Sequence, residues 1–155
     1  HHVEANVRTS LITALQYFYS IYGNYGRFSR VEIADKQIKL GKHTVDVSVD
    51  LIPKSGMDKT RLLIPVKTRV TEGGGHSHLF TRDIITAISD IKGEGSNYHI
   101  VAVIIAENWS PSEIITIGNQ IDKLFHFNMS PNKFVGFDEE AQIIFNRYIE
   151  SILRG

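Results

Sequence analysis

The segment that most constrains the fold is a run of apolar residues from Ile100 to Ala106, inside a predicted strand over residues 98–107. A continuous apolar run of strand length is typical of a central strand that is buried on both faces of its sheet. Helices packed on the two faces provide that cover in α/β proteins. The sequence therefore predicts an α/β protein with helices on both faces of a central mixed β-sheet.

Four helices and five strands are predicted around this run. In residues 4–22, Val7, Leu11 and Leu15 recur at helical spacing and form one apolar stripe. The remaining helices are predicted from Phe80 to Gly93, from Ser110 to Leu124 and over residues 138–153. Besides the central strand, strands are predicted over residues 31–40, 43–53, 60–69 and 133–137. The expected order is α-β-β-β-α-β-α-β-α.

Composition predicts one globular domain over residues 3–155. Hydrophobic residues make up 42% of the 155 residues and charged residues 22%, which is ordinary for a globular protein. His1 and His2 resemble the remnant of a purification tag, and whether the domain is a catalytic part of a longer protein stays open. No apolar run is long enough to span a bilayer, so no membrane association is expected. The absence of cysteine fits a cytoplasmic location.

Residues 43–53 and 60–69 are predicted to pair as the two arms of a β-hairpin. Strand alternation places Asp46, Ser48 and Asp50 on one face and the valines between them on the other. Folding back at residues 54–59 brings Lys67 roughly opposite Asp46. Two carboxylates that face a lysine are the minimum equipment for metal-assisted hydrolysis of a phosphodiester. The alternative interpretation is a solvated strand face with cross-strand ion pairs.

These residues and the order of elements resemble the PD-(D/E)XK nuclease superfamily, which includes many type II restriction endonucleases. The resemblance covers roughly residues 4–107 and implies a restriction-endonuclease-like αβββαβ core. Asp46 matches the first metal-binding acid of that family, and Lys67 matches its lysine. Glu4 matches an additional glutamate that the family often carries on its opening helix.

The sequence departs from the family at Pro65, which stands where the second metal-binding acid is expected. Proline also lacks a backbone N–H, so it predicts a bulge or a locally unpaired strand edge. Members of the superfamily that lack this acid take one from elsewhere. Asp50 is the favoured substitute, because it shares a face with Asp46, and Asp83 or Glu72 is the alternative.

The resemblance implies a bound Mg²⁺ or Mn²⁺ ion as cofactor. Asp46, Asp50 and the backbone carbonyl of Val66 would be sufficient protein ligands, because Mg²⁺ keeps several of its waters. The ion would lower the pKa of a bound water and stabilise charge on the phosphate. Lys67 would orient or deprotonate that water.

A glycine-rich segment over residues 72–78 is the predicted DNA contact. Its glycines would let the backbone approach a phosphate closely, and basic side chains surround them. The residues assigned to DNA binding are Arg69, Gly73, Gly74, Gly75, His76, His78 and Arg82. The expected substrate is double-stranded DNA, and a homodimer is expected because restriction enzymes usually cut both strands.

The leading hypothesis is therefore a divalent-metal-dependent DNA endonuclease that hydrolyses phosphodiester bonds. The first alternative is a catalytically inactive nuclease-fold domain that binds DNA or a protein partner, with Pro65 as the mark of a degraded site. The second is an α/β interaction domain in which the hairpin is only structural. The formal net charge of zero counts weakly against nucleic-acid binding.

Overall fold

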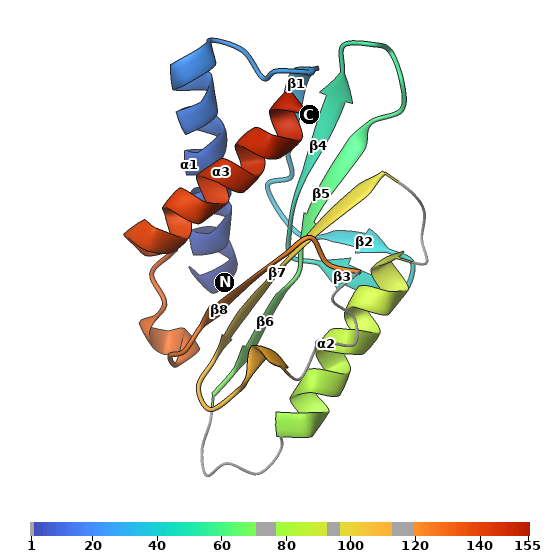
Figure 1. Ribbon diagram of the computed structural model, residues 1–155. Helices are drawn as coiled ribbons and strands as arrows, with labels where there is room; N and C mark the ends of the chain where they lie inside the picture. The colour runs from blue at the N-terminus through green and yellow to red at the C-terminus, as the bar shows by residue number, and fades with distance from the viewer. Residues whose placement is uncertain (1, 71–76, 93–96, 113–119) are drawn as a thin grey trace.

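The computed structural model describes residues 2–70, 77–92, 97–112 and 120–155, and it has helices on both faces of a central sheet (Figure 1). Helices α1 (His2–Tyr22) and α3 (Glu139–Arg154) cover one face, and α2 (Ser77–Lys92) lies on the other. The predicted mixed α/β fold class, with helices on both faces of a central mixed sheet, is confirmed. None of the described helices combines the length and the apolar character needed to cross a bilayer.

The sheet begins with an antiparallel meander and continues with parallel strands. Strand β1 (Phe28–Ile33) pairs with β4 (Val47–Pro53), which pairs with β5 (Thr60–Ile64). Strand β7 (Tyr98–Ala106) runs parallel to β5 and then to β6 (Val66–Arg69). Strand β8 (Lys123–Phe127) is parallel to β7 on its other side. A separate two-stranded ribbon consists of β2 (Ile38–Leu40) and β3 (His43–Val45).

Strand β7 is the buried central strand that the apolar run predicts. Its residues from Ile100 to Ala106 are all fully buried. Alternate side chains serve the two faces: Val103 and Ile105 pack in the cluster under α1 and α3, and Ile104 packs in the cluster under α2. The prediction from residues 98–107 is therefore confirmed, to within one residue at the end of the strand.

The first predicted helix and the last one are also confirmed. Helix α1 buries Val7, Leu11 and Leu15 on the predicted stripe. Helix α3 begins after Asp138, whose carboxylate accepts a hydrogen bond from the N–H of Ala141 at 2.8 Å. This contact satisfies one of the free backbone donors of the first turn.

Three predictions of local structure are wrong. The strand predicted over 31–40 ends at Ile33, and the segment after it enters the β2–β3 ribbon. Leu124, predicted as helical, lies in β8 instead, while residues 113–119 of that predicted helix are outside the described residues. The strand predicted over 133–137 is a short 3₁₀ turn (Pro131–Lys133) followed by a loop whose Phe134 fills the core. In each case a short apolar pattern did not distinguish strand, helix and packed loop.

Candidate metal and phosphodiester site

Asp46 lies in a break between β3 and β4, directly opposite the break between β5 and β6. Val47 pairs with Ile64, so the antiparallel register brings Asp46 opposite Pro65. Proline has no N–H to donate, and the β4–β5 ladder stops there. The Asp46 carboxylate instead accepts the N–H of Val66 at 2.7 Å. The interruption predicted at Pro65 is confirmed, but Lys67 lies two residues beyond the position directly opposite Asp46.

Glu4 brings a second carboxyl group to Asp46 from the first turn of α1. The Glu4 carboxyl group lies close enough to the Asp46 carboxyl group to raise its pKa, and both residues are half-buried. The pKa of Asp46 is raised to about 6, first by burial and then by the neighbouring Glu4 carboxyl group. The N–H of Val66 and the charge of Lys67 act in the opposite direction. Two carboxyl groups in contact share a proton or attract a cation, because two like charges this close repel.

Lys67 supplies the positive charge of this group. It lies in β6, opposite Ile104 of β7, and its side chain is half-buried. Its ammonium lies near enough to Asp46 to lower the pKa of that carboxyl group. The structure thus brings together Glu4, Asp46 and Lys67, which come from three separate elements of the fold.

The backbone of Val66 faces the same group. The carbonyl of Pro65 accepts the N–H of Val103, so Pro65 uses its oxygen toward β7. The next residue in an extended strand points its N–H and its carbonyl to the opposite edge. The N–H of Val66 does point to Asp46, so the carbonyl of Val66 lies on the Asp46 side of β6. A carbonyl oxygen there can join the two carboxylates as a ligand for a hard cation.

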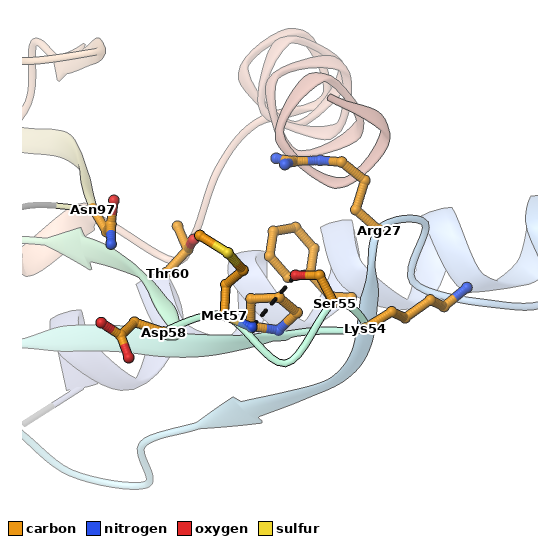
Figure 2. Close-up of a pocket in the computed structure, with 9 residues that line it drawn as sticks. Arg27, Lys54, Ser55, Met57, Asp58, Thr60 and Asn97 are labelled. Atoms are coloured by element: carbon orange, nitrogen blue, oxygen red, sulfur yellow. Dashed lines mark hydrogen bonds between the residues drawn. The ribbon is translucent and has the colours of Figure 1, made fainter.

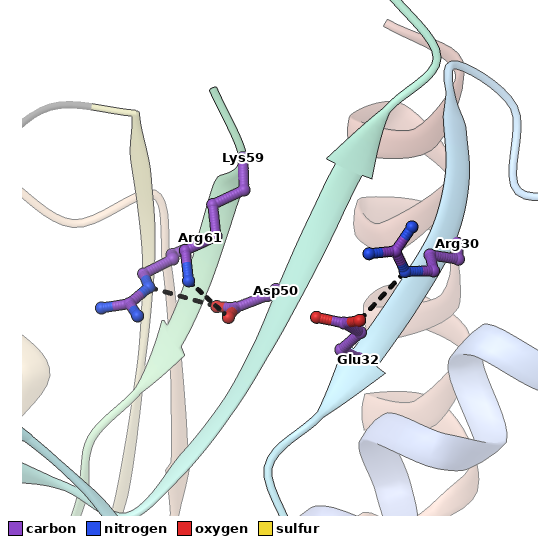
Figure 3. A network of polar contacts seen from close by, with 5 residues as sticks. All are labelled: Arg30, Glu32, Asp50, Lys59 and Arg61. Carbon is purple, nitrogen blue, oxygen red and sulfur yellow. Dashed lines mark hydrogen bonds and ion pairs between the residues drawn. The ribbon is translucent and has the colours of Figure 1, made fainter. Parts of the chain in front are cut away.

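Asp50, the favoured second metal ligand, lies apart from this group, and Figure 3 shows its ion pairs with Lys59 and Arg61. Four residues of extended strand separate it from Asp46, which corresponds to about 13 Å. Its carboxylate binds the Lys59 ammonium at 2.9 Å and the Arg61 guanidinium at 3.1 Å. The geometry therefore matches the cross-strand ion pairs of the alternative interpretation, which holds for Asp50 but not for Asp46.

The other proposed acids do not complete a three-acid site in the described part of the chain. Asp83 lies exposed on α2, and Glu72 lies outside the described residues. Within residues 2–70, 77–92, 97–112 and 120–155, no group of three or more histidine, aspartate or glutamate side chains is arranged to hold a metal ion. Glu4 is the acid that the structure places beside Asp46.

The predicted DNA contacts fall into two sets. Gly73, Gly74, Gly75 and His76 lie outside the described residues, whereas His78 lies in the first turn of α2 rather than in a loop, and Arg82 is exposed on that helix. Arg69 is engaged inside the protein. Its guanidinium donates to the carbonyls of Glu107 and Asn108 at 3.1 and 3.4 Å and stacks on the ring of Phe80. These contacts attach the end of β6 to the segment after β7.

Sequence reasoning missed Arg8, which contacts the main chain at Asp46. Its Nε donates to the carbonyl of Ala34 at 3.0 Å, and its Nη2 donates to the carbonyl of Asp46 at 3.1 Å. The spacing of four residues from Glu4 puts both side chains on one face of α1. That spacing is visible in the sequence, but the contact with Asp46 depends on how α1 packs against the sheet.

A cavity of about 520 Å³ lies at the other end of β4 (Figure 2). Arg27, Lys54, Ser55, Met57, Asp58 and Asn97 are among the residues that line it. Strand β4 starts next to Asp46 and ends at Pro53, which borders this cavity, so the length of the strand separates it from Asp46. None of the lining residues belongs to the predicted site.

Comparisons with known proteins give one structural likeness. No family model matches the chain, and no curated protein matches its sequence. A solved structure described as the EndoMS-dsDNA2 complex superposes with a TM-score of 0.36 at 12% sequence identity. The match covers 76% of this chain and 44% of that chain, so this chain spans less than half of that protein's length.

Proposed function

We propose that this chain is a divalent-metal-dependent nuclease that hydrolyses phosphodiester bonds of double-stranded DNA. The observation that supports this function is the convergence of Glu4, Asp46 and Lys67 at the break opposite Pro65. This arrangement lowers the stability of the fold, since it places two acids in contact in a half-buried position, so a stabilising role alone does not explain it.

The residues at the break fit Mg²⁺ or Mn²⁺. Both ions take oxygen ligands, and Mg²⁺ is usually held by one or two carboxylates while it keeps several waters. Glu4, Asp46 and the carbonyl of Val66 would be the protein ligands. Such an ion, when bound, supplies a water of lowered pKa and neutralises charge on the phosphate.

The protein's own groups divide the remaining work. The N–H of Val66 donates to one oxygen of Asp46 at 2.7 Å and so orients the carboxylate. The charge of the second carboxylate, Glu4, favours a cation over a shared proton at neutral and alkaline pH. The Lys67 ammonium, on the same side, would orient the attacking water and neutralise charge that develops on the scissile phosphate.

A domain that binds DNA without cutting it is the second candidate, and Pro65 is the observation that favours it. The family's second acid is absent at this position. In the proposed nuclease, Glu4 of helix α1 takes the place of that acid. The two candidates therefore differ in whether the chain cuts DNA, and Glu4 is the acid that cutting would require.

The test is cleavage of supercoiled plasmid DNA at low salt and pH 8 with Mg²⁺, with Mn²⁺ or with EDTA. The variants are Glu4→Gln, Asp46→Asn and Lys67→Met, and Glu32→Gln is the matched control. Glu32 is an exposed acid on β1 that pairs with Arg30 on the same strand. All variants need the same purification, so that a contaminating nuclease would cut equally in every sample.

Two results together would support the nuclease. The cleavage needs the metal, and its rate falls at least about 100-fold in each of the three site variants. The Glu32→Gln protein should cut like the original chain. If the original protein binds DNA but does not cut with either metal, the binding domain is the correct function. If Glu4→Gln cuts normally while Asp46→Asn does not, the assignment of Glu4 is wrong.

A further inference from the structure

We infer that Arg8 is a positioning residue of this site: it fixes the main chain at Asp46 to helix α1 and thereby holds the Asp46 and Glu4 carboxyl groups against each other. The inference rests on the proposed function for its consequence, but its geometry is independent of any metal. Arg8 touches neither the metal ligands' carboxyl oxygens nor Lys67 through a hydrogen bond in the described part of the chain.

The guanidinium of Arg8 joins two strand ends. The N–H of Ala34, just after β1, donates to the carbonyl of Ser48 and is the last hydrogen bond of that ladder before the chain turns away. Among the residues that the structure describes, no strand N–H donates to the carbonyls of Ala34 and Asp46, and Arg8 donates to both of them at 3.0 and 3.1 Å. A planar guanidinium can serve two acceptors at once, whereas an ammonium is a point charge without this fixed fork.

Helix α1 therefore contacts Asp46 in two places. Glu4 lies close to the side chain of Asp46, and Arg8, one turn later, donates a hydrogen bond to its backbone carbonyl. The N–H of Val66 holds the remaining side of the carboxylate. A loop residue with contacts to α1 and to β6 has little freedom to move, which is the condition for carboxylates that must meet one cation.

Helix α1 packs in the core through apolar side chains other than Arg8. Val3, Val7 and Leu11 are fully buried, and they anchor the helix in the core. Loss of the guanidinium should therefore loosen the segment around Asp46 while the helix stays in place. This separates a positioning role from a general role in folding.

The experiment uses Arg8→Met, which keeps most of the apolar stem and removes the charged fork. Arg30→Met is the matched control, because Arg30 is an exposed arginine with its partner on the same strand. Arg8→Lys is the conservative variant and serves also if Arg8→Met does not fold. Two quantities are measured: amide hydrogen exchange of Val66 without metal, by NMR, and the affinity for Mn²⁺, by calorimetry.

The inference predicts that Arg8→Met raises the exchange rate of the Val66 amide about tenfold, while the amide of Leu62 in β5 is unchanged. It predicts a loss of Mn²⁺ affinity of about 10- to 100-fold, with Arg8→Lys intermediate and Arg30→Met like the original chain. Unchanged exchange at Val66, or an equal rise at Val66 and Leu62, would overturn the inference. If the original chain binds no Mn²⁺ but Val66 exchanges faster in Arg8→Met, the proposed metal function fails and the positioning of Asp46 by Arg8 stands.

Discussion

Replacing Asp46 by asparagine should stabilise the metal-free protein at alkaline pH. Burial and the neighbouring Glu4 raise the pKa of Asp46 to about 6, so ionised Asp46 is unfavourable in the folded state. Asparagine is neutral at every pH. Its amide oxygen can still accept the N–H of Val66, and its amide group can donate to Glu4. The substitution removes the charge and keeps the hydrogen bonds.

The size of the effect follows from the shift in the pKa. An ordinary aspartate has a pKa of about 3.9, so the folded protein retains a proton on Asp46 between about pH 4 and pH 6 that the unfolded chain has lost. The stabilisation is full below about pH 4 and is lost as the pH rises through about 6. The full shift corresponds to about 3 kcal/mol, and solvent screening of this half-buried group reduces it to about 1–2 kcal/mol.

Urea unfolding in EDTA measures this difference, with the fluorescence of Trp109 as the signal. Trp109 is the single tryptophan and is 5% exposed in the folded protein. The stability of Asp46→Asn relative to the original chain should increase between pH 4 and pH 7 and then stay constant at about 1–2 kcal/mol. This corresponds to about 2–4 °C in Tm for each kcal/mol. A variant that is less stable at pH 8, or a difference that does not change with pH, would refute the reasoning.

Three more predictions follow from the same contacts. At 10 mM Mg²⁺ the Tm should rise by roughly 2–6 °C at pH 8 and hardly at pH 5, because Asp46, with a pKa raised to about 6, must lose its proton to bind the ion. Equal rises at both pH values would contradict the site. Asp50→Asn should lower the unfolding free energy by about 1 kcal/mol or less in urea titrations, because it removes the ion pairs with Lys59 and Arg61. It should leave the Mn²⁺ affinity in calorimetry unchanged. Weaker Mn²⁺ binding would restore Asp50 as a ligand. Gly26→Ala should lower the unfolding free energy by more than about 2 kcal/mol in the same titrations. Gly26 has a φ of +63°, and an added Cβ would lie 2.2 Å from the carbonyl oxygen of Leu153. A variant of normal stability would show that α3 can move away from this turn without cost.

Long patterns in the sequence were sufficient to predict the layers of the fold. The apolar stripe of α1 and the unbroken apolar run of β7 each contain enough residues to identify their element and its buried face. Residues 133–137 illustrate where this fails. Their aromatic residues fill the core from a loop, and a segment of that length does not reveal whether it is held by strand hydrogen bonds or by packing alone.

The candidate site shows the same division between local and tertiary information. Pro65 predicted the break in the strand correctly, because the missing N–H is a property of the residue itself. The preference for Asp50 over Asp83 and Glu72 as the second acid comes from strand alternation, which assigns a face but says nothing about distance along the strand. The contact of Glu4 and Arg8 with Asp46 depends on the seating of α1 against the sheet, and no pattern within either segment encodes it.

The central claim is that Glu4 and Asp46 together bind a divalent cation. Crystals soaked in Mn²⁺ and measured at an X-ray energy where manganese scatters anomalously test it most directly. If Glu4 and Asp46 bind the ion, the anomalous peak should mark a manganese ion bonded to their carboxylates, on the side of the Val66 carbonyl and next to Lys67. At saturating Mn²⁺ and pH 8, the absence of a peak at these two carboxylates, or a peak only elsewhere on the protein, would contradict it.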